Sequence, residues 1–537
     1  MGFQVFAIEC IDPMNATHGY VPELGVLNMT LLATALGWGF VLYFFYLAVC
    51  RLYFSPLAKF PGPKLAALTY WYEAYYDLVS NGGGGQFSFE VRRMHEKYGP
   101  VVRINPNELH IDDPEYYSEI YCNSSPSKPI DKSNRFKYRF NIPNATFSTT
   151  TAEHHRTRRT AIAPFFSKAR VRTLNGNLQQ ITDRISHRLS TEYAGTERVI
   201  NLNDVWGSMT ADVITELAFG RSTDYSSAPD FKSPFSSALG NLAWSAHWNA
   251  HFRLLVETMN WVPDHILGII VPPFKPILEY RQATICQLEE ILSGENIAAK
   301  EGSQPTIFHD ILASNLPSQE LSLKRLVEES TSINGAGQET VMWTLTVACF
   351  HILDNPDIQA RLKAELIGAM PNPNEILPWD QLEKLPYLSA VIAEGLRLGY
   401  GQVQRLPRVN RLGVWKYGDI KIPPGVIVGM DAYHMHTNET IFPMPLEFRP
   451  ERWLGDPKGP GGVHPLSHYL VPFSKGSRAC IGIHLAYMEL TTALATVFRR
   501  HELQLYKTNR TDVDFILDMV RPMPKRESKG VRVIVRS

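Results

Sequence analysis

The longest uninterrupted run of apolar positions lies near the start of the chain, over Val26–Val49, where 24 successive positions carry no charge. A helix rises 1.5 Å per residue, so a run of this length crosses a hydrocarbon core of about 30 Å. Three acidic residues precede the run and the first lysine or arginine, Arg51, follows it, which disfavours a cleaved signal peptide because such peptides begin with basic residues. The pattern predicts one transmembrane anchor over residues 26–50, a short lumenal segment over 1–25, and the rest of the chain in the cytosol. A buried core helix is the alternative interpretation.

Prolines follow the apolar run. Pro56 and the Phe60–Pro63 stretch interrupt any helix, because proline fixes φ and has no amide hydrogen. We expect a stiff hinge over residues 51–64 and one large domain over 65–537, since no long linker or low-complexity stretch divides that part. With the N-terminus in the lumen, Asn15 would be the sequon that glycosylation reaches.

Most of the remaining chain has the periodicity of amphipathic helices, and a few short alternating runs predict strands. The most extended helical pattern opens at Ser318, the expected N-cap, and ends at Asn355 before a proline. About 36 residues in one helix span roughly 54 Å, which suits a helix that crosses a whole domain. Further helices are expected from His155 towards Pro164 and over Leu178–Glu192, Asp204–Phe219, Gln282–Leu292, Asp357–Ile367, Leu388–Leu398 and Ile483–Arg500. Strands are expected at Val101–Asn105, Leu109–Ile111, Gly413–Ile422 and Val426–Met430.

Composition narrows the classes of function. The 537 residues include 53 basic and 53 acidic side chains, and a net charge of zero disfavours a dedicated nucleic-acid binder. The six cysteines form no C-x-x-C pair, and Glu153-His154-His155 lacks the H-E-x-x-H spacing of a zinc site. The glycines at 82–85 are not followed by the Lys-Ser/Thr of a phosphate-binding loop. Sparse, scattered cysteines fit a reducing compartment.

One cysteine, Cys480, stands in a glycine-flanked loop over Phe473–Gly482, directly before a strong helical pattern. Taken alone, a cysteine is most often a buried free thiol. A thiolate in such a loop can instead be the axial ligand of a haem iron. The residues around Cys480 are needed to decide between these two interpretations.

The spacing F-x-x-G-x-R-x-C-x-G of this loop resembles the signature of the cytochrome P450 family. Gly476 and Gly482 would let the backbone approach closely, and Phe473 would shield the sulfur from water. Arg478 would pair with an anionic haem propionate. The resemblance implies a haem b cofactor with Cys480 as the iron ligand. It also implies a mainly α fold with small β-sheets, preceded by the one N-terminal transmembrane helix.

The long helix contains Gly337, Glu339 and Thr340 in the sequence Ala-Gly-Gln-Glu-Thr. Glycine inside a helix costs up to about 1 kcal/mol relative to alanine, and we expect the close approach of a flat ligand to compensate for Gly337. A carboxylate and a hydroxyl joined through water can deliver protons to bound oxygen. The pair is similar to the acid–alcohol pair of haem-thiolate oxygenases, so Glu339 and Thr340 are the expected catalytic residues. A surface glutamate beside a packing threonine is the alternative.

Two more groups of residues match the family. Glu394 and Arg397 form an E-x-x-R pair, and Arg452 lies in the downstream Phe-Arg-Pro-Glu-Arg-Trp sequence. The resemblance implies that these three form a buried structural cluster that holds the loop leading to Cys480. Trp453 stands where the family usually has phenylalanine.

Haem propionates need cations, and the family's propionate-binding positions correspond to His155, Arg159 and Arg408, beside Arg478. His155 is a mild departure, since tryptophan is frequent there. His155 and Arg159 stand four residues apart, on one face of the expected helix. For any one of these four, an ordinary solvated basic residue is the alternative interpretation.

With its anchor and proline-rich hinge, the chain looks most similar to fungal microsomal members, many of which oxidise terpenoids and polyketides in secondary metabolism. The implied function is a monooxygenase of the endoplasmic reticulum membrane that oxidises a hydrophobic small molecule with O2. The 57 residues after Cys480 leave no room for a flavin domain. Electrons are therefore expected from a separate NADPH-cytochrome P450 reductase, with cytochrome b5 as an optional second donor. The basic Arg156, Arg158 and Lys475 would meet an acidic partner face.

Substrate contacts are expected at residues 139–149, near Ile333, at Gly401–Gln404 and around Asp518–Val520. These segments are mostly apolar or small, which favours a hydrophobic substrate. Two other functions stay open. The first is a haem-thiolate isomerase or dehydratase that needs no external O2, which the intact Glu339–Thr340 pair disfavours. The second is a non-enzymatic haem sensor or carrier.

Overall fold

The computed structural model describes residues 24–232, 234–294 and 306–536. The chain divides into two compact units, Met1–Lys59 and Phe60–Ser537. The larger unit carries every residue of the expected haem site.

In the smaller unit, α1 spans Leu24–Val49 and continues as one π-helical turn over Cys50–Phe54. The 24 residues Leu31–Phe54 are long and apolar enough to cross a membrane, by length and composition. The expected lumenal segment and Asn15 lie outside the described residues.

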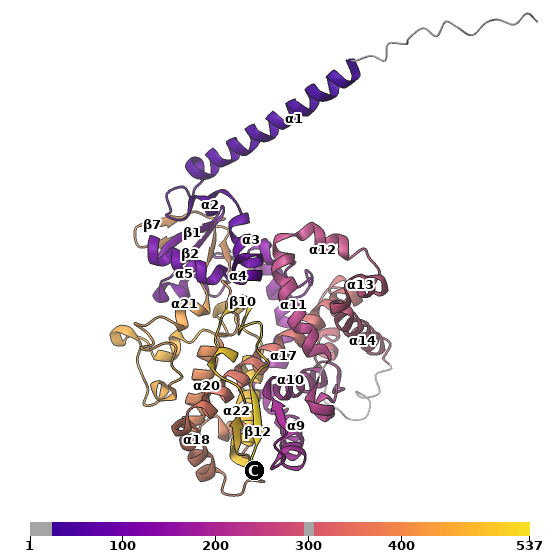
Figure 1. Cartoon of the computed structure of the whole chain (residues 1–537), viewed down its shortest axis with the longest axis vertical. Helices are drawn as coiled ribbons and strands as arrows, with labels where there is room; N and C mark the ends of the chain where they lie inside the picture. The colour runs from indigo at the N-terminus through magenta and orange to yellow at the C-terminus, as the bar shows by residue number, and fades with distance from the viewer. Residues whose placement is uncertain (1–23, 233, 295–305, 537) are drawn as a thin grey trace, which may run out of the picture. The chain divides into compact units, whose positions relative to one another are not determined.

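The larger unit is mainly helical (Figure 1). In the described residues up to 294, its helices are α2 Lys64–Leu68, α3 Trp71–Leu78, α4 Ser80–Gly83, α5 Phe87–Tyr98, α6 Tyr117–Ile120, α7 Ala152–Ile162, α8 Lys168–Arg172, α9 Asn175–Arg188, α10 Leu202–Phe219, α11 Pro234–His251, α12 Arg253–Met259, α13 Asp264–Ile270 and α14 Lys275–Leu292. They are followed by α16 Ile307–Leu312, α17 Leu323–Asp354, α18 Pro356–Ala369, α19 Trp379–Leu382, α20 Pro386–Gly399, α21 Ala432–His436 and α22 Ile483–Arg500.

The long helix α17 lies in the middle of this unit and packs against α10, α14, α20 and α22 (Figure 1). Gly337 of α17 faces α10, where a Cβ would come within 2.8 Å of the Ile214 side chain. The expectation that a flat ligand compensates for Gly337 is therefore wrong, because the space beside it is filled by the neighbouring helix. Close helix–helix packing is the physical reason for this glycine.

The start of α17 differs from the expected one. A 3-10 turn occupies Ser318–Leu321, and α17 begins at Leu323, so Ser318 is not its N-cap. The Glu320 carboxylate explains the break, because it binds Arg158 of α7 at 2.7 Å and His154 at 2.7 Å. These contacts with α7 keep the Ser318–Leu321 turn separate from α17.

Among the residues that the structure describes, strands form four small sheets. The largest has the order β1-β2-β8-β5-β3, in which β2 and β8 are parallel and the other neighbours are antiparallel. Its strands are β1 Val101–Asn105, β2 Glu108–Ile111, β8 Ile427–Gly429, β5 Arg408–Asn410 and β3 Ile130–Lys132. The others are β4 Val199–Asn201, β12 Arg532–Val535 and β9 Leu503–Leu505; β6 Trp415–Tyr417 with β7 Ile420–Ile422; and β10 Leu517–Met519 with β11 Arg521–Met523.

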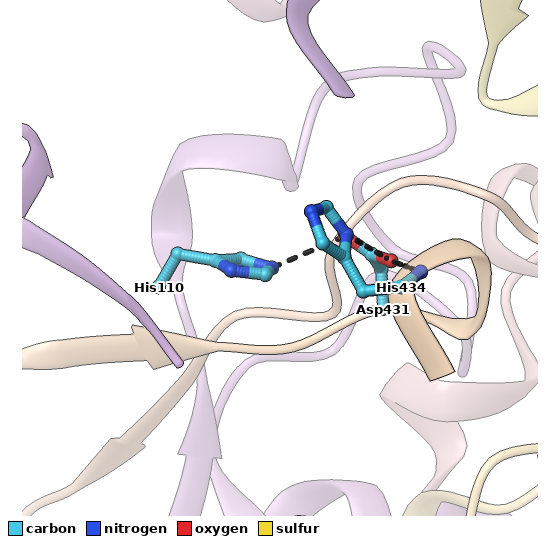
Figure 2. A group of neighbouring side chains, drawn as sticks. All are labelled: His110, Asp431 and His434. Carbon is cyan, nitrogen blue, oxygen red and sulfur yellow. Dashed lines mark hydrogen bonds and ion pairs between the residues drawn. The ribbon is translucent and has the colours of Figure 1, made fainter. Parts of the chain in front are cut away.

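A buried group of polar side chains fixes the large sheet to α21 (Figure 2). Asp431 caps α21 by accepting from the His434 amide at 2.8 Å, and its carboxylate also lies 2.9 Å from the His434 ring. From β2, His110 contacts the same carboxylate at 3.1 Å (Figure 2). Burial opposes the charge of Asp431, but the charges and hydrogen bonds of His434 and His110 hold its pKa well below its usual value. The group therefore joins two segments far apart in the sequence through one ionised carboxylate.

Candidate functional site

Cys480 closes a tight loop that begins at Phe473, because its amide N–H donates to the Phe473 carbonyl at 2.8 Å. Within the loop, Gly476 has φ +71°, and a Cβ there would lie 2.2 Å from the Cys122 carbonyl oxygen. Any side chain at this position is sterically excluded. A Cβ on Gly482 would meet no protein atom within 4 Å. Protein packing thus requires glycine at Gly476 but not at Gly482.

The Cys480 side chain has accessible surface although protein surrounds it, so the sulfur faces an internal space. Burial raises the pKa of the thiol, while the Gly482 N–H and the charge of Arg159 act in the opposite direction. A bound metal cation would supply the charge that a thiolate needs. On the side of α22, the ring of Phe473 packs against Tyr487 with centroids 5.5 Å apart.

On α17, Ala336 and Thr340 are accessible one turn apart, while Gln338 and Glu339 between them are buried. The Thr340 hydroxyl donates to the Ala336 carbonyl at 2.9 Å. This bond fixes the direction of the hydroxyl hydrogen and leaves the oxygen lone pairs free to accept a proton donor. An acid and an accessible alcohol therefore stand on consecutive residues of the central helix.

Glu339 has a partner that sequence reasoning did not find. Its Oε2 lies 2.9 Å from Nε of Arg521, the first residue of β11. Burial raises the pKa of the Glu339 carboxyl, and the charge of Arg521 opposes this shift. Arg521 directly follows the expected substrate segment Asp518–Val520, which was the available signal.

Three of the four basic residues expected at the propionates line one cavity of about 450 Å³: His155, Arg159 and Arg478. The Arg478 guanidinium donates to the carbonyls of Thr149, Thr150 and Thr151, with distances of 2.7 and 3.2 Å to the last two. Burial, followed by the charge of Arg408, lowers the pKa of Arg478 to about 9. The fourth residue, Arg408, is therefore close enough to act on this group.

His155 differs from the other three. Burial, together with the charges of Arg478 and Arg159, lowers its pKa to about 2. His155 is thus neutral at physiological pH. It offers an N–H donor to an anion and adds no positive charge to the group.

Lys132 is a fifth cation, which sequence reasoning missed. It stands on β3 directly opposite Arg408 of β5, and like charges in such a pair repel. Its ammonium donates to the Phe147 carbonyl at 2.6 Å. Burial and the charges of Arg408 and Arg478 lower its pKa well below the ordinary value.

The basic group lacks matching negative charge. In the part of the chain that the structure describes, no carboxylate forms an ion pair with Lys132, Arg408 or Arg478. Burial is the largest cause of the lowered pKa values of Lys132, Arg408 and Arg478, and repulsion between neighbouring cations adds to it for Lys132 and Arg478. Cations that are buried without an ion pair favour the binding of an anion. Two carboxylates brought by a haem would supply such anions, and the residues present fit that cofactor.

The expected structural cluster is formed as one buried network. Glu394 Oε1 lies 2.7 Å from Nη2 of Arg397 and 2.9 Å from Nε of Arg452. Burial works to raise the pKa of Glu394, but the hydrogen bonds and charges of the two arginines lower it. Trp453 also participates, because its indole N–H donates to Glu394 Oε2 at 2.8 Å. The departure from phenylalanine therefore adds a hydrogen bond that phenylalanine lacks.

His436 connects this cluster to the segment before Cys480. Its Nδ1 donates to the Arg397 carbonyl at 2.9 Å, and its Nε2 accepts from the Val471 amide at 2.9 Å. Arg397 in turn donates to the His436 carbonyl at 2.9 Å. The reciprocal bonds hold the chain two residues before Phe473 at a fixed place.

The expected substrate segments are brought partly together. The Val403 amide donates to the Val520 carbonyl at 3.0 Å, which joins residues 401–404 to the β10–β11 hairpin. Arg139 is buried, and its Nε and Nη2 have no hydrogen-bond partner among the described residues. Gln404 and Asp518 are buried as well, so these segments are more polar than their composition suggested.

The basic residues expected to meet a redox partner are not equally available. Arg156 is exposed, but Arg158 is buried and paired with Glu320 at 2.7 Å, so the expectation for Arg158 is wrong. Lys475 is half-buried, and its ammonium lies 3.1 Å from the Ser118 hydroxyl. Of the three, Arg156 is the freest to contact another protein.

Comparisons with known proteins agree over nearly the whole chain. The family model described as Cytochrome P450 matches residues 72–527. The chain is 38% identical to Cytochrome P450 monooxygenase orf6 of Eupenicillium brefeldianum, covering 95% of this chain and 100% of that protein. It is 39% identical to Cytochrome P450 monooxygenase sdnE of Sordaria araneosa (92% and 96% covered) and 38% identical to Tryptophan 6-hydroxylase fscE of Fusarium equiseti (93% and 96%).

Among solved structures, a crystal structure of a cytochrome P450 superimposes with a TM-score of 0.66 and covers 84% of this chain and 94% of its own. At 18% identity this likeness concerns the fold alone. The mainly α fold with small sheets is confirmed, and the homologues named monooxygenases indicate an oxidoreductase. The chain belongs to the cytochrome P450 family, whose members bind haem.

Proposed function

We propose that this protein is a haem b-dependent monooxygenase that oxidises a hydrophobic small molecule of terpenoid or polyketide type in fungal secondary metabolism. It would use O2 and electrons from NADPH-cytochrome P450 reductase. Two observations together carry the proposal: the Cys480 sulfur is accessible, and the buried cations Lys132, Arg408 and Arg478 form no ion pair with a described carboxylate. One relative is named a tryptophan 6-hydroxylase, and tryptophan is neither a terpenoid nor a polyketide.

The residues that would hold the cofactor have separate tasks. Cys480 would bind the iron as a thiolate, and Arg159, Arg408, Arg478 and Lys132 would pair with the propionates. When bound, a thiolate-ligated haem activates O2 for insertion into a C–H bond. The hydrogen bond from Cys480 N to Phe473 O keeps the loop in one conformation, so the sulfur is presented in a fixed direction.

Glu339 and Thr340 would move protons. The accessible Thr340 oxygen can accept from water, and the Glu339 carboxylate beside it can take a proton from solvent and pass it on. Burial of Glu339 favours its protonated form, which is the form that donates. An intact acid–alcohol pair is typical of an oxygenase and disfavours an isomerase or dehydratase.

Membrane attachment is the proposed location, as a single-pass protein of the endoplasmic reticulum with the haem domain in the cytosol. The apolar α1 supports it. The larger unit also exposes apolar side chains on α12, α13 and the segment between them, including Leu254 at 77%, Trp261 at 84% and Ile269 at 77%. Such a patch is unusual on a soluble surface and suits contact with lipid. Brominated lipid in nanodiscs should quench tryptophan fluorescence less in Trp261→Phe than in the wild type, with Trp38 of α1 giving the quenching common to both. Equal quenching in the two proteins would contradict this contact.

A reduced, carbon-monoxide-bound spectrum of the full-length protein tests the core of the proposal. We expect the Soret position of a thiolate-ligated haem, and its loss in Cys480→Ala. A Soret band typical of imidazole ligation would contradict the assignment of Cys480. Turnover that needs neither O2 nor NADPH would indicate the isomerase or dehydratase alternative. Haem binding without any turnover of precursors from a deletion strain would favour a sensor or carrier.

A further inference from the structure

The ion pair between Glu339 and Arg521 has an unusual geometry. Nε and Oε2 approach to 2.9 Å, yet both atoms are buried and neither makes an aligned hydrogen bond with a described residue. An arginine that locks a carboxylate normally makes two parallel hydrogen bonds. Here the contact is a single, misaligned approach of charges. Charge attraction survives misalignment, whereas a directional hydrogen bond does not.

The position of Arg521 is set by the hairpin that carries it. Val520 forms the turn between β10 and β11 with φ +69°, a left-handed conformation that is strained for a β-branched residue. Hydrogen bonds hold it there, since the Val520 amide donates to Asp518 Oδ1 at 2.9 Å and its carbonyl accepts from Val403 at 3.0 Å. The Asp518 carbonyl contacts the His247 ring at 2.7 Å. Arg521 is therefore directed at Glu339 by a rigid support.

The charges that act on Glu339 are few. Arg521 is the one described ionisable group whose charge changes the proton affinity of Glu339, and burial is the opposing influence. Elsewhere in the hairpin, Asp518 is engaged with Ser88 and Val520. The protonation of Glu339 thus depends on a balance between burial and a single arginine.

We propose that Arg521 is a positioning residue that holds the Glu339 carboxylate at β11 and favours its ionised form against the effect of burial. This inference rests on the proposed monooxygenase function, because it assigns the control of one member of the acid–alcohol pair. The proton that Glu339 takes up comes from solvent, and Arg521 itself neither gains nor loses one. Any displacement of the β10–β11 hairpin would weaken the ion pair and leave burial to favour the protonated acid.

The test compares Arg521→Gln with Arg521→Lys, which keeps the charge, in full-length haem-loaded protein in nanodiscs. Arg536→Gln is the matched control, since it removes an exposed arginine and its ion pair with Glu197 from the same C-terminal region. Infrared difference spectra give the pH midpoint of the protonated carboxyl band, assigned to Glu339 by its absence in Glu339→Gln. We expect Arg521→Gln to raise this midpoint by about one pH unit or more. Arg521→Lys keeps the charge, so its midpoint should lie much closer to that of the wild type than to that of Arg521→Gln. The midpoint of Arg536→Gln should equal that of the wild type.

A second readout follows NADPH consumption and hydrogen peroxide release with reductase, as a function of pH. Arg521→Gln should move the pH profile of peroxide released per NADPH in the same alkaline direction as the infrared midpoint. An unchanged infrared midpoint in Arg521→Gln, in protein that retains the thiolate spectrum, overturns the inference. If Glu339→Gln leaves the peroxide ratio unaltered while Arg521→Gln shifts the midpoint, the proton-relay role is wrong but the control by Arg521 stands.

Discussion

The indole N–H of Trp453 donates to Oε2 of Glu394 at 2.8 Å, inside a network that otherwise consists of arginines and backbone groups. The Glu394 carboxylate also accepts hydrogen bonds from the side chains of Arg397 and Arg452 and from the Arg449 amide. Because Glu394 is fully buried, every donor that reaches it offsets part of its lost hydration. The network also supports the segment before Cys480 through His436.

Replacing Trp453 with phenylalanine should weaken this network. The variant keeps an aromatic ring but loses a hydrogen bond to a buried charge, which costs about 1.5–3 kcal/mol of unfolding free energy. Urea denaturation monitored by far-UV circular dichroism, which follows the backbone helices, would measure the loss of stability. Trp261→Phe, at an exposed position, is the matched control. A Trp453→Phe midpoint equal to that of the control would contradict the importance of this bond.

Lys132→Met should loosen haem while leaving the fold intact. Removing one cation lowers the attraction for a propionate, and we expect haem loss to apomyoglobin to accelerate about 10-fold, which corresponds to about 1.4 kcal/mol. Lys128→Met is the control, since Lys128 is paired with Glu119 at 2.6 Å. Equal haem-transfer rates in the two variants would mean that Lys132 contacts no propionate.

Gly476 and Gly482 should respond differently to alanine. Gly476→Ala places a Cβ 2.2 Å from the Cys122 carbonyl at a residue with φ +71°, so the apoprotein itself should be destabilised. Gly482→Ala meets no protein atom and should leave the apoprotein unfolding midpoint unchanged. Any effect at Gly482 would then be confined to haem content. Measuring the unfolding midpoint with and without haem separates the two; equal apoprotein midpoints for the two variants would refute the steric argument.

Asp431 should make the protein sensitive to acid. Its folded pKa lies below the unfolded value of about 3.9, so the folded state binds fewer protons at that carboxyl. The stabilisation is present above pH about 3.9 and is lost as pH falls through the folded pKa. Asp431→Asn should therefore be less stable than the wild type at neutral pH and show a flatter decline in acid. Urea midpoints between pH 3 and 7, with the exposed Asp456→Asn as control, would check this. Parallel acid profiles for Asp431→Asn and the wild type would contradict it.

Local patterns determined much of the fold. The helix expected over Ile483–Arg500 has these same bounds in the structure. Gly482 marks its start and the apolar periodicity runs to its end, so both signals are local to this segment. The helix expected to start at Gln282 begins at Lys275, since Pro276 is compatible with a first turn and the periodicity does not reveal it. Ser318 fails as a cap for a different reason, because Glu320 is held by a helix distant in sequence.

By itself, the sequence determined the apolar N-terminal helix, the Cys480 loop, the Glu394–Arg397–Arg452 residues and the adjacent acid and alcohol on the long helix. These signals depend on residue types at short fixed spacings. Only the tertiary structure decided which residues oppose one another across the fold: Lys132 against Arg408, Gly337 against Ile214, and Arg521 against Glu339. Each of these pairs joins segments far apart in the chain. Burial and the field of a distant charge depend on three-dimensional proximity, which one-dimensional spacing does not encode.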